Sequence, residues 1–434
     1  MEFLTPGERV KKIRKMLKMK QRELQSENIT RGFISMIEGN RTTMSRETAS
    51  IIAEKFNKRA RELGIDLNID GYYLLMTPAQ EAEYYCIQKL NQINTLEDLN
   101  ELKEIFEIAD EYKLKRVTAL AYIKIGDVMY NNQNFQEAFI NYHKALDILL
   151  LNNIKEQLPY VYNMLGACKV ALLESPEATM YFHKALEYAE EINDIEIKIK
   201  ASYNNALCCR CISEPAVSID YIQKCLSVLD KEKDFEYYVY IKSIEANCYR
   251  DMKEYDKALE IFRGLVEEIK DNNNPLLGFL YTNIGEVYME KNDFEKSMEY
   301  LNEAEKIRRK EDKNLLSHTL IEKANLYIKM GLYKEALFSL EEGIEISYRN
   351  KDIEYIVKGS YLLAEVYKKL GNKQAIIETY KRLANILQNM GSKKETLKTY
   401  IELALLYIEN NDVSNAKYFL EKSREVIEQK TIKK

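Results

Sequence analysis

The sequence predicts an all-α fold in which a small N-terminal helical domain precedes an α-solenoid of about nine helical hairpins. The main observation is an internal repeat, because small residues recur every 39 or 40 positions inside amphipathic helical patterns. A stack of hairpins also explains how 434 residues with only 6 Pro and 15 Gly fold, since each unit packs on its neighbours and no single large core is needed. The repeated small residues are Cys86, Gly126, Gly166, Ala206, Ala246, Gly285, Ala324, Ala364 and Ala404.

The segment from Tyr281 to Ala304 shows the pattern of one unit most clearly. With Gly285 counted as position 8, the small residues Ser297 and Ala304 stand at positions 20 and 27, and the large Leu301 stands at position 24. Small residues let two antiparallel helices approach, while large ones fill the space beside them. This alternation resembles the tetratricopeptide repeat (TPR), which implies a right-handed TPR-like solenoid over residues 79–434.

The N-terminal part differs from the rest of the chain in charge. Residues 1–62 carry 15 Lys or Arg and 8 Asp or Glu, a net charge of +7, although the whole chain carries −5. A basic domain on an acidic body favours a polyanionic partner. Residues 63–78 form a predicted linker, because Gly64, Gly71 and Pro78 interrupt the helical pattern. The many apolar residues of this linker predict that it docks on the first repeat or on a second subunit.

The basic domain contains the segment KQRELQSENITRGFISMIEGNR, residues 20–41. Its order of Gln, Leu, a turn, a Thr-Arg pair, spaced Ile residues and a Gly-Asn turn resembles the helix-turn-helix of XRE/Cro-type repressors. In that family the second helix lies in the major groove, which implies that residues near its start face the bases. Arg14 matches the structural arginine of the family, which implies that it pairs with Glu38. The resemblance assigns to DNA binding the residues Lys20, Gln21, Thr30, Arg31, Phe33, Ser35 and Arg41.

These residues are expected to act in two ways. The four residues of the second helix face bases, while Lys20, Gln21 and Arg41 lie near the phosphate backbone and position the domain. The turn between the two helices is one residue shorter than in the family, and Gly32 and Phe33 stand where polar readers are frequent. Apolar contacts or DNA shape are therefore expected to contribute to sequence preference. The alternative interpretation is a helical cap whose basic residues are only solvated.

A ligand is expected on the concave face of the solenoid. In the TPR register, positions 2, 5, 9, 12 and 13 of each first helix point into this face. Asn amides suit the backbone of an extended peptide, Arg offers a fork for a carboxylate, and Tyr combines apolar area with a polar tip. The alternative is that Asn and Tyr are abundant throughout the chain and that part of the set is solvated surface. The candidate peptide-binding residues are Tyr160, Asn163, Tyr203, Arg210, Tyr240, Asn247, Arg250 and Asn325.

A helix-turn-helix domain followed by TPR-like units resembles, over nearly the whole chain, the RRNPP-type regulators, the cytoplasmic peptide-pheromone receptors of Gram-positive quorum sensing. The resemblance implies a homodimeric transcription factor that binds double-stranded DNA and a short signalling peptide. Peptide binding is expected to change dimer geometry and thereby DNA binding. Two alternatives stay open: a TPR modulator or phosphatase of a response regulator, and a peptide-independent regulator or scaffold that binds a protein partner.

The sequence contains no pattern typical of a catalytic site, a cofactor site or a metal site. Cys208, Cys209 and Cys211 crowd one predicted helix, but the three His residues lie elsewhere, so small helix-packing residues are expected rather than zinc ligands. No run of about 18 apolar residues occurs, so we expect no membrane span. These features predict a cytoplasmic protein that is not an enzyme.

Overall fold

The computed structural model describes residues 3–269 and 274–428. Within these ranges the chain forms 22 α-helices and two short 3-10 helices, and no β-strand. The predicted all-α fold is confirmed. By internal contacts the chain divides into two compact units, Met1–Val128 with Asp147–Asn152, and Met129–Leu146 with Asn153–Lys434. The domain bounds 1–62, 63–78 and 79–434 stay predictions.

The N-terminal domain consists of α1 (Pro6–Met16), the 3-10 helix η1 (Gln21–Leu24), α2 (Arg31–Glu38) and α3 (Arg46–Glu62). The hydroxyl groups of Thr5, Thr30 and Ser45 accept backbone N–H groups at the starts of α1, α2 and α3, which fixes where these helices begin. The short helix predicted to begin at Gln21 is a 3-10 helix of four residues. It is followed by α2, the second helix of the motif.

The linker packs on the N-terminal domain itself. It contains a short helix, α4 (Gly71–Leu75), whose Leu74 is buried in the same core as Val10 and Ile52. Gly71 lies so close to α3 that an added Cβ would stand 2.7 Å from the backbone nitrogen of Ser50. Docking on the first repeat or on a second subunit was expected instead; the apolar residues of the linker are used to complete the N-terminal core.

Arg9 joins the N-terminal domain to the first helix of the repeat array. Its buried guanidinium donates to the carbonyl oxygens of Leu4, Tyr73 and Met76 at 2.8, 3.0 and 2.6 Å. It also pairs with the carboxylate of Glu81, in the first helix of the array, at 2.8 Å. A buried charge with this many acceptors is fully satisfied, so the linker carbonyls and Glu81 hold one another in place.

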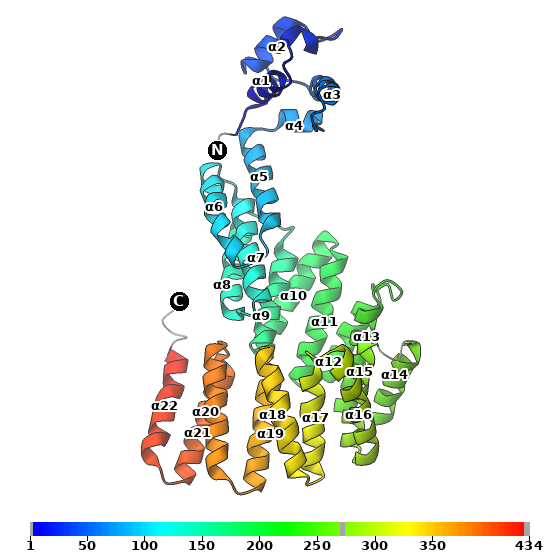
Figure 1. The fold of residues 1–434 in the computed structure, drawn as a ribbon, viewed down its shortest axis with the longest axis vertical. Helices are drawn as coiled ribbons and strands as arrows, with labels where there is room; N and C mark the ends of the chain where they lie inside the picture. Colours follow the sequence, from blue (N-terminus) through cyan, green and yellow to red (C-terminus); the bar gives the residue numbers. More distant parts are fainter. Residues whose placement is uncertain (1–2, 270–273, 429–434) are drawn as a thin grey trace. The chain divides into compact units, whose positions relative to one another are not determined.

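The described part of the repeat array forms nine helical hairpins, as the sequence predicts. Figure 1 labels their helices along the chain. Their helices are α5 (Pro78–Gln92) and α6 (Leu102–Glu111), which follows the 3-10 helix η2 (Glu97–Glu101); α7 (Lys115–Asn131) and α8 (Phe135–Leu151); α9 (Leu158–Ala171) and α10 (Ser175–Ile192); α11 (Ile195–Cys211) and α12 (Pro215–Leu226); α13 (Phe235–Asp251) and α14 (Tyr255–Glu268); α15 (Pro275–Glu290) and α16 (Phe294–Glu311); α17 (Leu316–Lys329) and α18 (Tyr333–Arg349); α19 (Ile353–Lys369) and α20 (Lys373–Asn389); α21 (Lys393–Glu409) and α22 (Val413–Glu428).

Small residues at position 8 bring the two helices of a hairpin together. In α9, an added Cβ on Gly166 would stand 2.5 Å from the ring of Phe182 in α10. In α15, the carbonyl oxygen of Gly285 accepts the hydroxyl of Ser297 from α16 at 2.8 Å. The steric reasoning behind the TPR resemblance therefore describes the contact that closes each of these hairpins.

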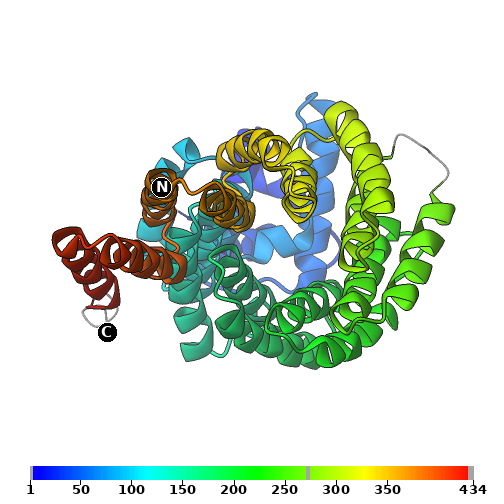
Figure 2. The same cartoon turned by 90° about the horizontal axis from the view of Figure 1, so that it is seen from below.

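In the hairpins from α9 to α18, the first helix is more deeply enclosed than the second. In one hairpin α15 has 11 buried residues and α16 has four, and the first helices of neighbouring hairpins, such as α13, α15 and α17, contact one another. Seen from below, the hairpins of the second unit follow a curve with their helices in two layers (Figure 2). Groups on the first helices therefore determine how successive hairpins are spaced.

Two distant parts of the second unit also contact one another. The buried hydroxyl of Ser392 donates to the carbonyl oxygen of Leu172 at 3.1 Å, and Leu173 packs against the C-terminal core cluster. Nearby, Lys351 Nζ donates to the carbonyl oxygen of Asn132 at 3.2 Å. These contacts join turns about 220 residues apart in sequence, so the curvature of this unit is held at more than one place.

Substitution of Gly166 tests the close approach within a hairpin. We expect Gly166→Ala to destabilise the protein by about 1–3 kcal/mol, because the added methyl group overlaps Phe182. Gly264→Ala is the matched control, since nothing lies within 4 Å of its added Cβ and alanine stabilises a helix relative to glycine by roughly 0.5–1 kcal/mol. Urea unfolding followed by circular dichroism measures both; equal midpoints for the two variants would contradict the packing argument.

Candidate functional site

The predicted DNA-reading helix, α2, has an exposed polar surface near its start. Thr30 is its N-cap, and the hydroxyl of Thr30 accepts the backbone N–H of Phe33 at 3.2 Å. Arg31 and Ser35 are exposed, whereas Phe33 is half-buried and packs against the core of the domain. Thr30, Arg31 and Ser35 are thus available to a partner, and part of the Phe33 ring serves the fold.

The three residues predicted to lie near phosphates are placed differently. Lys20 and Arg41 are exposed on either side of the motif. Gln21 is only partly exposed, and its side-chain amide donates to Glu38 Oε2 at 2.9 Å. The amide of Gln21 therefore helps to hold the motif, and the two cations are the groups free to meet a polyanion.

Arg14, Glu38 and Gln21 form a polar cluster behind α2. Arg14 Nε lies 2.5 Å from Glu38 Oε1, Arg14 Nη2 lies 2.9 Å from Oε2, and Nη1 donates to the carbonyl oxygen of Met19 at 2.8 Å. The predicted pairing of Arg14 with Glu38 is confirmed. Burial alone raises the pKa of Glu38, but hydrogen bonds from Arg14 and Gln21 outweigh burial and lower that pKa below its usual value.

Four of the eight predicted peptide-binding residues, Asn163, Arg210, Asn247 and Arg250, belong to a polar ladder between successive first helices. Asn204 Nδ2 of α11 donates to Asn163 Oδ1 of α9 at 3.1 Å. Asn247 Nδ2 of α13 donates to Asn283 Oδ1 of α15 at 2.9 Å. Asn247 Oδ1 is buried and has no partner in the described part of the chain, so this amide keeps an unused acceptor.

Charged pairs continue the ladder. Arg210 Nε of α11 lies 2.7 Å from Asp251 Oδ2 of α13, and Arg250 Nη1 of α13 lies 2.5 Å from Glu286 Oε2 of α15. Burial opposes ionisation of Glu286, but Arg250 and Lys358 lower its pKa below the usual value. The two arginines predicted to take a peptide carboxylate are therefore already paired with carboxylates of the chain.

The last charged pair of the ladder joins α17 to α19, where Lys358 Nζ contacts Glu322 Oε1. Glu322 is buried, and burial together with the nearby Glu286 raises the pKa of Glu322 to about 7. Two carboxylates, Glu286 and Glu322, therefore lie close enough to influence one another, each beside its own cation. A position-by-position register identifies which residues face inward, but it does not show that Glu322 and Lys358 meet.

The remaining candidates are tyrosines and one asparagine. Tyr160 and Tyr203 are partly buried against neighbouring helices, and burial raises the pKa of Tyr203 to about 12. The hydroxyl of Tyr240 donates to Glu236 at 3.0 Å, and its ring packs edge-on against Phe279. Asn325 is partly exposed. The role of the whole set in peptide binding stays a prediction.

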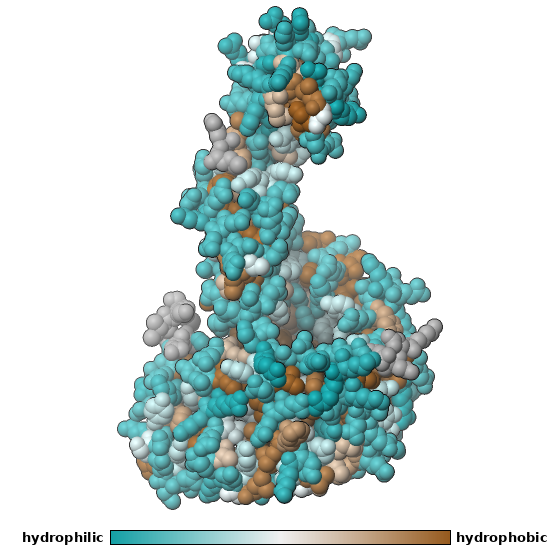
Figure 3. All heavy atoms as spheres, in the orientation of Figure 1, coloured by the Kyte–Doolittle hydropathy of each residue, from teal (hydrophilic) through white to brown (hydrophobic). Residues whose placement is uncertain are grey.

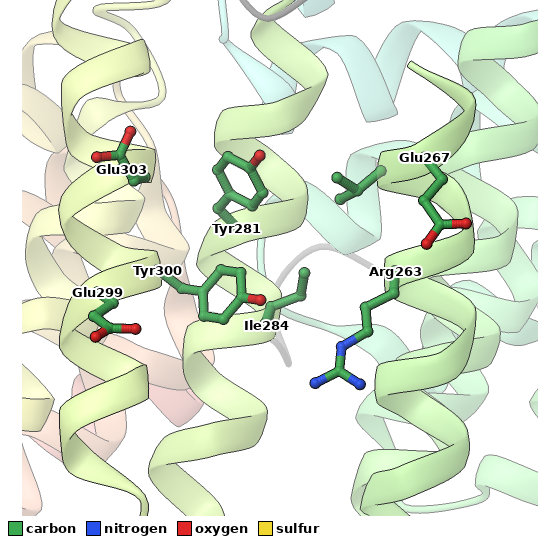
Figure 4. A pocket seen from close by; sticks show the side chains of 8 residues that line it. Arg263, Glu267, Tyr281, Ile284, Glu299, Tyr300 and Glu303 are labelled. Atoms are coloured by element: carbon green, nitrogen blue, oxygen red, sulfur yellow. The ribbon is translucent and has the colours of Figure 1, made fainter. Parts of the chain in front are cut away.

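A separate cavity of about 360 Å³ lies between α14, α15 and α16 (Figure 4). Two tyrosine rings, Tyr281 and Tyr300, stand 5.8 Å apart in its wall, and Arg263 Nη2 donates to the hydroxyl of Tyr288 beside it at 2.5 Å. None of the predicted peptide-binding residues lines this cavity. It is therefore distinct from the ladder.

Comparisons with known proteins agree with the two parts of the chain. The family described as "Helix-turn-helix domain" matches residues 7–79, and the family described as "Tetratricopeptide repeat" matches residues 243–310. A family described as "Anaphase-promoting complex subunit 5" matches residues 122–203 and 286–369. The chain therefore combines a helix-turn-helix domain with tetratricopeptide repeats, the combination on which the resemblance to RRNPP-type regulators rests. No curated protein sequence matches the chain.

Solved structures share this fold at low sequence identity. A Rap protein complexed with Competence and Sporulation Factor has a TM-score of 0.51 and 15% identity, covering 81% of this chain and 99% of that chain. The apo form of the quorum sensor NprR from B. thuringiensis has a TM-score of 0.45 and 16% identity, covering 80% and 99%. At such identities the Rap likeness concerns the helical fold and not the ligand.

None of the described helices is both long enough and apolar enough to span a membrane. On the face drawn in Figure 3, hydrophilic residues cover most of the area, with small hydrophobic areas between them.

The Glu38 cluster predicts a pH dependence of stability. Because the folded-state pKa of Glu38 is lowered from 4.5, its contribution is complete above that value and is lost as the pH falls through the folded-state pKa. We expect Glu38→Gln to be less stable at pH 7 by about 1–3 kcal/mol and to lose less stability than the wild type on acidification. Thermal unfolding between pH 7 and pH 3 measures this; parallel curves for the two proteins would contradict it.

The ladder predicts unequal effects of two arginines. Arg250→Met is expected to destabilise the protein by about 3 kcal/mol, because Glu286, whose side chain is 17% exposed, loses the buried cation that pairs with it. Arg210→Met serves as the matched control and is expected to change stability by about 1 kcal/mol or less, since its pair with Asp251 is more exposed. Urea unfolding of both variants provides the measurement. Similar losses would show that the Arg250 pair is not a structural member of the ladder.

Proposed function

We propose that this protein is a cytoplasmic, homodimeric transcriptional regulator whose repeat array binds a short signalling peptide and thereby alters DNA binding. The observation that carries the proposal is the joining, in one chain, of a helix-turn-helix domain and a tetratricopeptide array with a polar ladder on its first helices. One part has the form of a DNA reader, and the other has the side chains that suit an extended peptide.

DNA binding is supported by the surface of the N-terminal domain. Exposed Arg31 and Ser35 at the start of α2 are placed to reach base edges, while exposed Lys20 and Arg41 are placed to meet phosphates. The domain carries a net charge of +7 over residues 1–62. Two such domains in a dimer would contact two half-sites, so the spacing between them would decide whether the protein fits its operator.

Peptide binding is supported by the chemistry of the ladder. Asn163 and Asn247 can exchange their present partners for the backbone of an extended peptide, because each amide both donates and accepts. The buried, unused acceptor of Asn247 favours such an exchange. Since each pair spans two hairpins, a peptide that replaces these pairs would change the spacing of the hairpins, and small changes add up along a solenoid.

Control by a peptide requires a difference in affinity between two shapes of the array. A ligand that binds both shapes equally shifts nothing, however tightly it binds. The ladder pairs can produce such a difference in affinity. In a shape in which these pairs are broken, their side chains are available to the peptide; in a shape in which they are intact, they are not. All the alternatives share this array. The helix-turn-helix domain favours the regulator over the modulator, and a response to peptide would distinguish it from the peptide-independent regulator or scaffold.

DNA binding is tested by fluorescence anisotropy on DNA from the protein's own promoter across a salt series. Affinity should fall steeply with salt, and Lys20→Ala or Arg41→Ala should each reduce the salt slope by about 1, because each removes one phosphate contact. Arg349→Ala, in the exposed part of α18, is the control and should leave the slope unchanged. Absence of binding at low salt would favour the cap interpretation of residues 20–41.

The switch is tested by adding peptides fractionated from the culture medium to the same assay. A cognate peptide should change the affinity or the footprint on DNA. Unchanged affinity and footprint at saturating peptide would contradict the switch. Incubation with a phosphorylated response regulator separates the alternatives, since faster loss of phosphate would favour the modulator and no effect would favour the regulator.

A further inference from the structure

Arg308, in the last turn of α16, is a buried cation without a carboxylate partner. Its side chain is 1% exposed, yet it forms no ion pair with any described residue. Its Nη1 donates to the carbonyl oxygen of Leu315 at 2.5 Å, and its Nε is buried without a partner. By contrast, the neighbouring Arg309 is exposed and pairs with both oxygens of Glu342. A buried charge left in this state is costly unless something else meets it.

The guanidinium of Arg308 lies at the start of α17, which has no side-chain cap. Leu315 is the N-cap residue, and it provides no side-chain acceptor for the first N–H groups of the helix. The hydroxyl of Ser317, in the first turn, is fully buried and also has no partner. The N–H of His318 donates to the carbonyl oxygen of Leu315 at 3.2 Å. A helix start favours negative charge, and this one contains a buried hydroxyl without a partner and accepts a hydrogen bond from a buried cation whose Nε also has none.

The position of the Arg308 side chain depends on how α15 and α16 pack together. An added Cβ on Gly278, in the first turn of α15, would stand 2.9 Å from Arg308 Cγ. The glycine therefore leaves room for the side chain of Arg308 to cross α15 toward the start of α17. A longer residue at position 278 would displace the guanidinium, which indicates that its location depends on this gap.

The charges around Arg308 leave its own charge unmatched. Burial lowers its pKa, while Tyr355, Asp312, Glu286 and Tyr240 act in the opposite direction. Of the two carboxylates, Asp312 accepts the backbone N–H of Leu315 at 3.4 Å, and Glu286 is paired with Arg250.

Tyr240, a predicted peptide-binding residue, packs its ring against Phe279 at 5.3 Å between ring centres. Phe279 is the chain neighbour of Gly278, against which the side chain of Arg308 packs. Arg308 therefore lies close to one of the residues on which the proposed function places the peptide.

We propose that Arg308, Ser317 and the start of α17 form a binding site for a carboxylate of the ligand. This inference rests on the proposed function, because it names the chemistry that the array recognises. The carboxylate belongs either to the C-terminus of a peptide or to an Asp or Glu side chain, and both would accept hydrogen bonds from the guanidinium, the hydroxyl and the helix N–H groups. Arg210 and Arg250, which were expected to take this carboxylate, are occupied by Asp251 and Glu286.

The test uses the full chain and a synthetic set of peptides of five to seven residues. Peptides that co-elute with the wild type in size exclusion are identified by mass spectrometry and remade in three forms: unchanged, with an amidated C-terminus, and with Asp and Glu replaced by Asn and Gln. We expect one neutralised form to bind at least about tenfold more weakly by titration calorimetry, because a charge-assisted contact is lost. The form that loses affinity identifies the source of the carboxylate.

Variants then assign the effect to the site. Arg308→Met and Ser317→Ala should bind the charged and the neutralised peptide with similar affinity, and Arg308→Lys should recover part of the difference. Arg309→Met, one residue away in the same helix, is the control and should discriminate as the wild type does. Equal binding of all peptide forms by the wild type, or full discrimination by Arg308→Met, would overturn the proposal.

Small anions separate this proposal from the failure of peptide binding. If the wild type retains no peptide, the proposed function fails, but the site is still tested by the melting temperature in sodium acetate and sodium sulfate against sodium chloride at equal ionic strength. Anions stabilise many proteins by exclusion, so the comparison is between variants. A larger rise for the wild type than for Arg308→Met supports the anion site, and equal rises overturn it.

Discussion

The side-chain pairs between successive first helices are the interactions on which the repeat array depends. In a solenoid each unit contacts only its neighbours, so the contacts between units set the angle from one hairpin to the next. Here these contacts include the buried amide pair of Asn247 with Asn283 and the partly buried ion pair of Arg250 with Glu286. Polar pairs of this kind have defined distances and directions, so each of them fixes a spacing that apolar packing alone would leave broader.

The first unit contains a comparable polar tie between the helix-turn-helix domain and the array. Arg9 binds three backbone carbonyls around the linker and the carboxylate of Glu81 in α5. Leu74 of the linker completes the core of the helix-turn-helix domain. The segment that looks like a flexible joint in sequence is therefore part of a packed domain, and α5 is held to that domain by a buried ion pair. This tie joins the array to the helix-turn-helix domain, beside the ring of Phe3, which packs against Tyr85 and Tyr112.

Sequence reasoning reaches the fold more fully than the site, for a physical reason. Small residues such as Gly166 and Gly285 are fixed by sterics within one hairpin, so their spacing reveals the repeat. The Arg14–Glu38 pair lies within one compact motif and was also predictable. The partner of Arg250 is different, because Glu286 stands 36 residues away in the next hairpin and the register does not show which inward side chains meet. Burial is likewise invisible in sequence, and burial is what distinguishes Arg308 from its neighbour.

The ladder also determines what kind of ligand can act on the array. Ion pairs that are already satisfied gain little from an added charge, since the new contact has to replace one that is lost. A peptide backbone can replace an Asn–Asn contact with little loss, because amides exchange like for like. A charged group finds an advantage only where the chain has left a charge unmatched, as at Arg308. Amide pairs and one unmatched cation together favour a ligand recognised mainly through its backbone and at a single negative group. Such a ligand binds more tightly when the hairpins have one particular spacing. The difference in binding free energy between the two spacings is the amount by which the ligand can shift the equilibrium between them.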